Sequence, residues 1–275
     1  MFTLSGFADE ISPDLTEQLE VLESEGIRYL ELRGVWGKGV LELDNGEIAT
    51  IKGELEARGM GVSAIGSPIG KIRLDEPFEP HLEKFKRALE LAELFGCEYI
   101  RLFSFYPAQG EEIAERREEV FERMWALDEA ARGCPVKLAH ENERAIYGNV
   151  PERCRDLLTT LPRERWVAVF DPGNFVVEGV KPFEEAYPLL EEFIAYCHIK
   201  DATFDPPSIQ PAGQGDGQLP EVLGALKQGG VSCFLSLEPH LSMAGQFGGF
   251  TGPELFCKAS EALKKVLTEI GAEWN

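Results

Sequence analysis

The sequence has 275 residues, 44% of them hydrophobic, which is enough to form one large buried core. Its formal net charge is -21, with 48 acidic and 27 basic residues. This balance opposes a nucleic-acid partner, because phosphate binding requires a basic surface. The sequence shows neither an apolar run of transmembrane length nor a signal segment at its start, so we expect a cytoplasmic protein without a membrane partner.

Six cysteines are scattered along the chain, at positions 97, 134, 154, 197, 233 and 257, and no two of them form a CxxC pair. Cys97, Cys197 and Cys233 lie in or beside apolar runs. We expect them to be small buried residues of a protein in a reducing compartment, rather than members of a disulfide framework.

Eight apolar runs alternate with helical patterns along the chain. Strands are expected at residues 2–7, 27–32, 62–66, 99–105, 136–141, 166–171, 193–199 and 233–238. Ser12 and Pro13 predict the start of the first helix, since serine is a good N-cap and proline a good first helical residue. Residues 111–132 predict a long charged helix, and Pro151 and Pro182 each predict the start of a later one.

Strict alternation of strands and helices, without a linker, predicts one α/β domain over residues 1–275 that closes into a (β/α)₈ TIM barrel. A doubly wound open sheet is the alternative architecture, although it rarely uses eight units so evenly. The dinucleotide-binding pattern GxGxxG does not follow the first strand. The pattern therefore favours the barrel and gives no sign of a dinucleotide cofactor.

Four apolar strands end in residues that can bind metal ions: Glu141, Asp171, His198 and Glu238. In a barrel the carboxyl ends of all strands meet at one mouth, so these side chains are expected to converge there. Three carboxylates and one imidazole suit one divalent ion, Mn²⁺, Mg²⁺ or Co²⁺, and Zn²⁺ is also compatible. Each acid alone could be a helix cap or an ion-pair partner, but the four together favour a metal site. Glu143 competes with Glu141, which we prefer because it directly ends the apolar run.

Other polar or aromatic residues near strand ends are candidates for binding a substrate. They are Glu31, Trp36, Lys71, Arg101, Asn174, Lys200, Asp201 and His240. Arg101 and Lys71 could hold a phosphate or carboxylate. Arg101 equally suits pairing with an inner carboxylate such as Glu31, and Lys71 suits a solvated loop. Trp36 could cover a sugar ring or anchor its glycine-rich loop.

The four histidines are expected to differ in role. His198 is a metal-ligand candidate, and His240 lies two residues after Glu238, where it could support that side chain. His140 is expected to be structural. His81 lies on a predicted helix and is expected to be exposed.

Several short motifs occur in order along the chain: Glu31-Leu32-Arg33, His140-Glu141-Asn142, Asp171-Pro172-Gly173-Asn174, His198-Ile199-Lys200-Asp201, Gly213 to Gly217, and Glu238. In their order and spacing they resemble the xylose-isomerase-like TIM-barrel superfamily of sugar and sugar-phosphate isomerases and epimerases. The resemblance implies that Glu141, Asp171, His198 and Glu238 bind one divalent metal. It also implies that the two glutamates act as acid and base on opposite faces of a carbohydrate substrate. Many epimerases of the superfamily have a histidine where this chain has Asn174, and asparagine cannot transfer a proton near neutral pH.

The implied reaction removes a weakly acidic proton next to a carbonyl group, with the metal stabilising an enediolate. Return of the proton to the opposite face gives an epimerase, and return to the adjacent carbon gives an isomerase; both stay open. An inosose-type dehydratase would use the same site and then expel a β-hydroxyl. The acidic charge disfavours an AP-endonuclease-like nuclease. Such a nuclease also needs several histidines from different strand ends for a trinuclear zinc site, and this chain has only four histidines in all. The presence of the four metal-ligand candidates disfavours a non-enzymatic sugar-binding barrel. A homo-oligomer is compatible with all of these readings.

Overall fold

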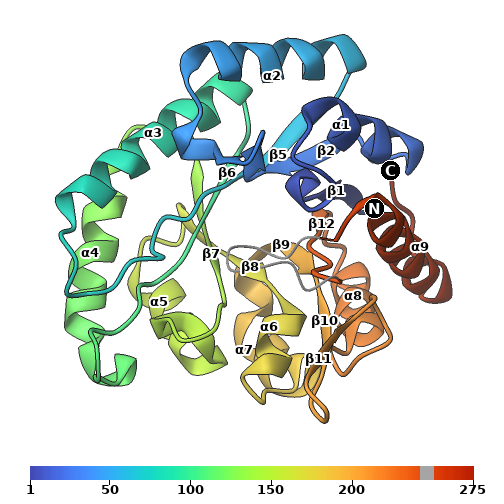
Figure 1. Cartoon of the computed structure of the whole chain (residues 1–275). Helices are drawn as coiled ribbons and strands as arrows, with labels where there is room; N and C mark the ends of the chain where they lie inside the picture. The colour runs from blue at the N-terminus through green and yellow to red at the C-terminus, as the bar shows by residue number, and fades with distance from the viewer. Residues whose placement is uncertain (242–250) are drawn as a thin grey trace.

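Eight strands form one parallel sheet that curves into a barrel (Figure 1). The computed structural model describes residues 1–241 and 251–275. The barrel strands are β1 (Thr3–Gly6), β2 (Tyr29–Leu32), β5 (Gly61–Gly66), β6 (Tyr99–Leu102), β7 (Lys137–Glu141), β8 (Trp166–Phe170), β9 (Ile194–Ile199) and β12 (Phe234–Leu237). Their hydrogen-bonded order is β1-β12-β9-β8-β7-β6-β5-β2, and β1 and β2, at its two ends, lie beside each other. The ring is therefore nearly closed, which confirms the predicted TIM barrel.

Parallel pairing places the carboxyl ends of all eight strands at one mouth of the barrel. His198 on β9 lies opposite Ser236 on β12, and Ser236 is two residues before Glu238 in the sequence. On the other side of the cluster, Glu141 on β7 lies opposite Val169 on β8. These registers bring the chemically active strand ends to a common level.

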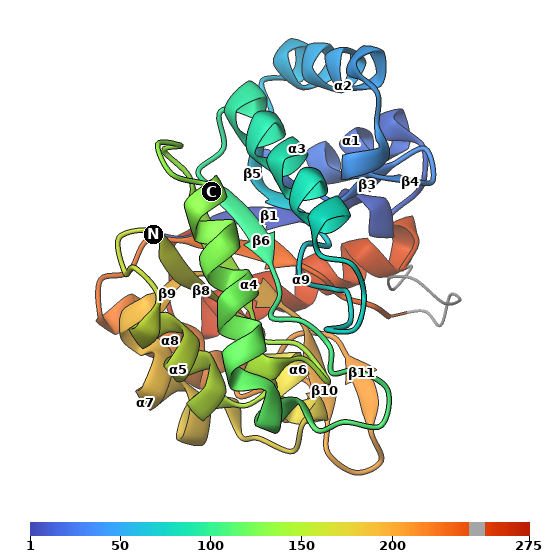
Figure 2. The ribbon, with the colours of Figure 1, turned by 90° about the vertical axis from the view of Figure 1, so that its left-hand side faces the viewer.

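Helices cover the outside of the barrel (Figures 1 and 2). The outer helices are α1 (Leu15–Ser24), α2 (Asn45–Arg58), α3 (Glu79–Phe95), α4 (Arg117–Ala130), α5 (Pro151–Thr160), α7 (Tyr187–Leu190), α8 (Leu219–Gln228) and α9 (Pro253–Glu269). Helix α3 illustrates why they pack there: Phe85, Leu89 and Ala92 form a buried stripe at helical spacing. It ends at Gly96, whose φ of 64° is readily adopted by glycine.

The first helix begins later than the sequence predicts. Helix α1 starts at Leu15, and the Asp14 carboxylate accepts the Glu17 N–H at 3.0 Å as the N-cap. Ser12 is not the cap, because its hydroxyl accepts the N–H of Asp14 itself at 3.1 Å, ahead of the helix. The predicted start at Ser12 and Pro13 is therefore wrong by about two residues.

Two other predicted helices are shorter or interrupted. The charged helix predicted at 111–132 is reduced to α4, which follows a 3₁₀ turn over Ile113–Arg116. Pro182 opens a π-helical turn (Pro182–Ala186), and α7 follows it. Pro188 near the start of α7 has no N–H to continue a regular helix, which explains the interruption. Pro151 does open α5, as predicted.

Three small insertions follow strand ends at the mouth and were not predicted. They are the hairpin of β3 (Gly34–Val35) and β4 (Lys38–Gly39), the helix α6 (Pro172–Val177), and the hairpin of β10 (Asp201–Thr203) and β11 (Ser208–Gln210). Because loops at this face carry function in TIM barrels, these insertions shape the surroundings of the strand-end residues.

All six cysteines are free thiols. Cys97, Cys197 and Cys233 are buried as predicted, and burial raises the pKa of Cys97 to about 12. These thiols therefore act as small apolar groups of the core. In the part of the chain that the structure describes, no helix has both the length and the apolar character needed to cross a bilayer.

His81 is buried, so the prediction that it is exposed is wrong. Its side chain lies against the barrel, and its Nε2 atom accepts the backbone N–H of Gly70 at 2.7 Å. Gly70 has a φ of 92°, and a Cβ there would lie 2.1 Å from the carbonyl oxygen of Phe103. His81 thus fixes the loop after β5 against the loop after β6. Burial, with Lys84 and Arg123 nearby, lowers the pKa of His81 to about 4.

We predict that His81 makes the stability of the fold depend on pH. Between about pH 6.5 and 4 the unfolded chain binds a proton at this histidine and the folded chain does not. The free energy of unfolding should therefore fall as the pH drops, by up to about 1.4 kcal/mol per pH unit for this group. His81→Gln keeps an acceptor but removes the titration, so its slope between pH 6.5 and 5 should be shallower. Urea unfolding followed by circular dichroism measures both slopes, and equal slopes would contradict the assignment.

Candidate metal centre at the barrel mouth

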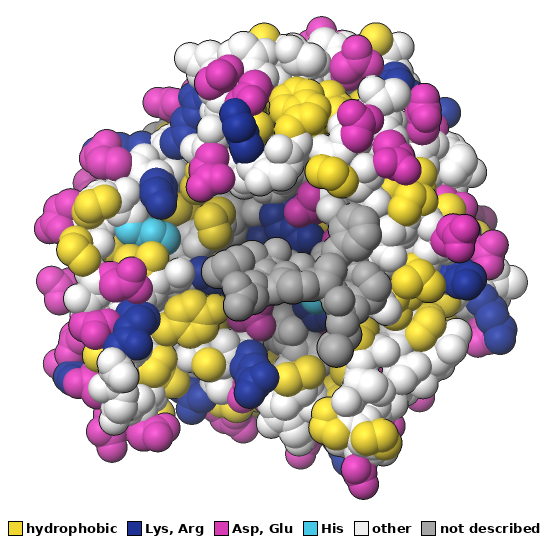
Figure 3. All heavy atoms as spheres, in the orientation of Figure 1, with side chains coloured by type: hydrophobic (Ala, Val, Ile, Leu, Met, Phe, Trp, Pro, Cys, Tyr) yellow, Lys and Arg dark blue, Asp and Glu magenta, His cyan; other side chains and the backbone are white. Residues whose placement is uncertain are grey.

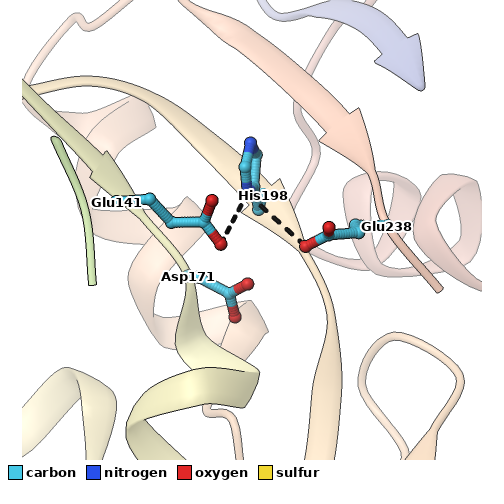
Figure 4. Close-up of side chains that lie close together, drawn as sticks. All are labelled: Glu141, Asp171, His198 and Glu238. Atoms are coloured by element: carbon cyan, nitrogen blue, oxygen red, sulfur yellow. Dashed lines mark ion pairs between the residues drawn. The ribbon is translucent and has the colours of Figure 1, made fainter. Parts of the chain in front are cut away.

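Four strand ends bring together the residues that the sequence singled out as metal ligands (Figure 4). Glu141, Asp171, His198 and Glu238 each offer one donor atom, and these atoms all lie within 4.8 Å of one another. The four side chains are almost fully buried, with Glu238 the most exposed at 3%. The predicted convergence is therefore present in the structure.

His198 is oriented from behind by another carboxylate. Its Nε2 atom lies 3.2 Å from Glu31 Oε2, and Glu31 Oε1 accepts the hydroxyl of Tyr196 at 3.1 Å. His198 Nδ1 faces Glu141 Oε1 at 3.2 Å and Glu238 Oε2 at 3.6 Å, without a well-directed hydrogen bond. A carboxylate on one imidazole nitrogen leaves the other nitrogen free to bind a metal ion. Burial would lower the pKa of His198, but Glu141 and Glu31 raise it to about 10, so the centre favours a positive charge.

Glu31, predicted as a substrate contact, lies behind the imidazole of His198 in the structure. It is 1% exposed and lies beneath His198, so its carboxylate orients the imidazole. Arg101 was expected to bind an anion or to pair with an inner carboxylate such as Glu31. It pairs with an inner carboxylate, that of Glu141: its Nη1 atom donates to Glu141 Oε2 at 3.0 Å, and its Nη2 atom donates to the carbonyl of Gly66 at 3.0 Å.

Glu141 is held on both oxygens. Arg101 binds Oε2, and the side-chain amide of Asn174 donates to Oε1 at 3.2 Å and to the carbonyl of Asn142 at 2.9 Å. Burial alone would raise the pKa of Glu141, but His198 and Arg101 lower it to about 2. Asn174 was predicted as a substrate contact. In the structure its amide group donates to Glu141 and to the backbone of Asn142, and so helps to position Glu141.

Asp171 has one committed oxygen and one that faces the centre. Oδ1 accepts the backbone N–H of Asn174 at 2.9 Å and caps helix α6. Oδ2 lies 2.8 Å from the ammonium of Lys200 but receives no well-directed hydrogen bond. The Asn142 side chain exchanges two hydrogen bonds of 2.9 Å with the Asp171 backbone and so fixes its position. Burial raises the pKa of Asp171 to about 6, although Lys200 opposes the shift.

Glu238 is surrounded by cations. Arg33 donates to Oε1 at 2.9 Å, and Lys200 donates to Oε2 at 2.8 Å. Burial would raise the pKa of Glu238, but Lys200 and His240 hold it well below its usual range. Sequence reasoning missed the role of Arg33, although it belongs to a motif that ends the second strand. Its Nε atom also pairs with Asp9 at 2.7 Å.

His240 lies beside Glu238, as the spacing suggested. Its Nε2 atom is 3.5 Å from Glu238 Oε1 and 3.1 Å from Glu10 Oε1. The backbone N–H of His240 donates to Glu10 Oε2 at 2.9 Å, and the residue has a φ of 46°. Glu10 was not predicted as a site residue, and the only sequence signal for it is that it closely follows the first strand. Glu10 holds His240 at the rim of the centre by both contacts.

The remaining predicted residues are more peripheral. Lys71 pairs with Glu143 at 2.8 Å and lies over the ring of Phe103, so Glu143 is not part of the ligand cluster. Trp36 is half-buried against the core in its hairpin and has a φ of 54°, which favours the anchoring role. His140 is buried and bonds to Ser104 Oγ at 2.9 Å, as expected of a structural histidine.

Asp201, predicted as a substrate contact, bonds to the backbone of the loop that follows β9 and β10. Its carboxylate accepts the backbone N–H groups of Gly213, Gly215 and Gly217 at 2.8, 3.0 and 2.8 Å. A Cβ at Gly215 or Gly217 would lie 2.4 or 2.6 Å from Asp201 Oδ1, so only glycine leaves room for this cradle. Asp201 therefore folds the loop after β9 against its own strand.

Viewed into the mouth, the molecule has a central hollow in which basic and acidic side chains are visible (Figure 3). This agrees with the ion pairs of Arg33 with Glu238 and of Arg101 with Glu141 at the strand ends.

Comparison with solved structures gives the same architecture. The chain resembles a D-tagatose 3-epimerase-like protein, with a TM-score of 0.78 and 17% identity over 98% of both chains. It resembles the probable 3-DHS dehydratase AsbF of Bacillus anthracis, with a TM-score of 0.75 and 17% identity over 95% of this chain and 98% of that chain. An IOLI protein with a bound zinc atom gives a TM-score of 0.71 and 19% identity over 98% of this chain and 97% of that chain.

Sequence comparison assigns the family directly. No protein with a curated function matches the chain closely enough to be counted as a relative. The family model described as xylose isomerase-like TIM barrel, however, matches residues 19–265. Because this match spans most of the sequence, the chain belongs to the xylose isomerase-like TIM-barrel family.

Proposed function

We propose that the protein is a divalent-metal-dependent isomerase or epimerase of a sugar, sugar phosphate or related polyol. The observation that carries the proposal is the placement of Glu141 and Glu238 on either side of His198, 3.2 and 3.6 Å from its Nδ1 atom (Figure 4). Two carboxylates around one cation-binding centre can face the two sides of one substrate carbon. The likeness to a D-tagatose 3-epimerase-like protein supports a carbohydrate substrate.

The four side chains of the cluster suit one divalent ion. Three carboxylates and one imidazole form an oxygen-rich donor set that fits Mn²⁺, Mg²⁺, Co²⁺ or Zn²⁺. His198 Nδ1 and Asp171 Oδ2 are buried donor atoms without well-directed hydrogen bonds, as ligand atoms would be. When bound, such an ion would polarise a substrate carbonyl and stabilise the charge left by a departing α-proton. The zinc atom in the similar IOLI protein supports metal binding here.

Glu141 and Glu238 are the proposed proton carriers. Arg101 and Asn174 fix the two oxygens of Glu141, while Arg33 fixes one oxygen of Glu238. One carboxylate removes the proton next to the carbonyl, and the other returns it. Return to the opposite face gives an epimer, and return to the neighbouring carbon gives an aldose–ketose pair.

A dehydratase is the second candidate. The probable dehydratase AsbF resembles the chain about as closely as the epimerase-like protein does. Asn174 also replaces the histidine found in many epimerases, and its amide is occupied by Glu141 and Asn142. Such a dehydratase would begin with the same proton abstraction and then expel a β-hydroxyl.

The nuclease alternative is not supported. A trinuclear zinc site needs several histidines at the mouth, but His81 bonds to Gly70 and His140 bonds to Ser104. Only two of the four histidines therefore lie at the carboxylate cluster. The net charge of -21 also opposes binding to DNA.

We predict one metal ion per chain, bound with the help of Glu31. Elemental analysis of Mn²⁺-reconstituted protein should give one ion per chain. Glu31→Gln should weaken Mn²⁺ binding about 10–100-fold in isothermal titration calorimetry, because the group that orients His198 is changed. Glu143→Gln is the matched control, since Glu143 pairs with Lys71 instead. Equal losses in the two variants, or two or three tightly held ions, would refute the ligand assignment.

We also predict that Glu238 carries a proton in the reaction. Ketoses and inososes are first screened for exchange of carbon-bound hydrogen with solvent D₂O, and NMR detects the exchange. With an active substrate, Glu238→Gln should slow exchange by about 10²–10⁴-fold even with metal bound, because the amide cannot accept the proton. Metal occupancy of the variant is checked in the same sample. Unchanged exchange would leave Glu238 as a ligand only.

A further inference from the structure

Lys200 forms ion pairs with two of the four candidate metal ligands. Its ammonium is 2.8 Å from Asp171 Oδ2 and 2.8 Å from Glu238 Oε2, and the side chain is 5% exposed. Glu238 Oε2 also lies 3.6 Å from His198 Nδ1. Lys200 therefore pairs with Asp171 Oδ2, the oxygen that does not cap α6, and with Glu238 Oε2, the oxygen that does not bind Arg33.

The fold makes room for this lysine. Lys200 follows β9, and its stem passes across the first turn of α6, where Gly173 has no side chain. A Cβ at Gly173 would lie 2.7 Å from Lys200 Cγ and 3.0 Å from the Lys200 carbonyl carbon. Glycine at this position thus permits the approach that brings the ammonium to Asp171.

Lysine differs from the two arginines of the mouth in a way that matters here. Arg101 spans Glu141 and the carbonyl of Gly66, and Arg33 spans Asp9 and Glu238, so each guanidinium also bonds to a group outside the ligand set. The Lys200 ammonium is a compact charge on a flexible stem, and both of its ion pairs are with candidate ligands. It can therefore leave the ligands without breaking another ion pair among the described residues.

We propose that Lys200 is a tethered cation that competes with the divalent metal for Asp171 Oδ2 and Glu238 Oε2. This rests on the proposed metal site. A metal ion bonded to those two oxygens would lie within a few ångströms of the ammonium, and two cations so close in a buried site repel strongly. Metal binding therefore requires Lys200 to withdraw. The lysine lowers metal affinity and, when no metal is bound, keeps two buried carboxylates paired.

Lys200→Met tests the competition because methionine fills similar space without a charge. In isothermal titration calorimetry with Mn²⁺, this variant should bind about tenfold or more tightly than the wild type. In EDTA its melting temperature should fall below that of the wild type, and saturating Mn²⁺ should restore it. Lys71→Met is the matched control, since Lys71 pairs with Glu143 outside the cluster, and its Mn²⁺ affinity should stay within about twofold of the wild type.

The outcomes separate this inference from the proposed function. A wild-type protein that binds no divalent ion would overturn the metal site and the competition with it. Binding in the wild type, with equal or weaker binding in Lys200→Met, would overturn the competition alone and make Lys200 a support for the ligands. If Lys200→Met cannot be purified in EDTA but is recovered with Mn²⁺, the tethered-cation role is supported. Lys200→Gln, whose amide can still donate a hydrogen bond, then provides the affinity measurement.

Discussion

Negative charge buried at the barrel mouth is the constraint on which this structure depends. Glu31, Glu141, Asp171 and Glu238 are each 3% exposed or less, and an unpaired carboxylate in such a place is costly. Each one lies beside a basic side chain: His198, Arg101, Lys200, and Arg33 with Lys200, respectively. Arg33 and Glu238 are 205 residues apart in sequence, so this pair forms only when the barrel closes. The fold and the candidate site therefore stabilise each other.

Hydrogen bonds to the backbone hold the charged groups in place. The Asn142 side chain donates to the backbone carbonyl of Asp171 and accepts its N–H. The Asp201 carboxylate accepts three glycine N–H groups of the next loop. Glu10 similarly holds the His240 N–H and accepts the hydroxyl of Thr251. These three side chains thus position the loops around the centre. A mouth built in this way is preorganised before any ligand arrives.

The four-residue cluster could be predicted from the sequence because the strand-end rule is local. An apolar run that stops at Glu141 or His198 predicts a strand that ends in a metal-binding side chain, and closure of the barrel brings these strand ends together. The partners that orient these residues could not be predicted in the same way. Glu31 reaches His198 across 167 positions, and nothing near either residue signals that contact. The exposed position predicted for His81 was wrong, and the helical spacing itself opposes it, because His81 lies four residues before Phe85 and so on the buried face of α3.

The two proposed proton carriers differ in their surroundings, and this bears on the reaction. Glu141 is bound by Arg101 and by the Asn174 amide, neither of which transfers protons near neutral pH. Glu238 instead lies beside Lys200 and His240, whose side chains can exchange protons. The other neighbour of Glu141 is His198, whose Nδ1 atom would be taken up by the metal ion. We infer that, with the metal bound, a proton taken up by Glu141 has no relay through its neighbours and must return to the substrate or pass directly to solvent. Additional acid chemistry, such as protonation of a leaving hydroxyl, is served better from the Glu238 side. Because only Glu238 has neighbours suited to such acid chemistry, the site is compatible with a dehydratase as well as an epimerase. Both reactions would begin at the same cluster.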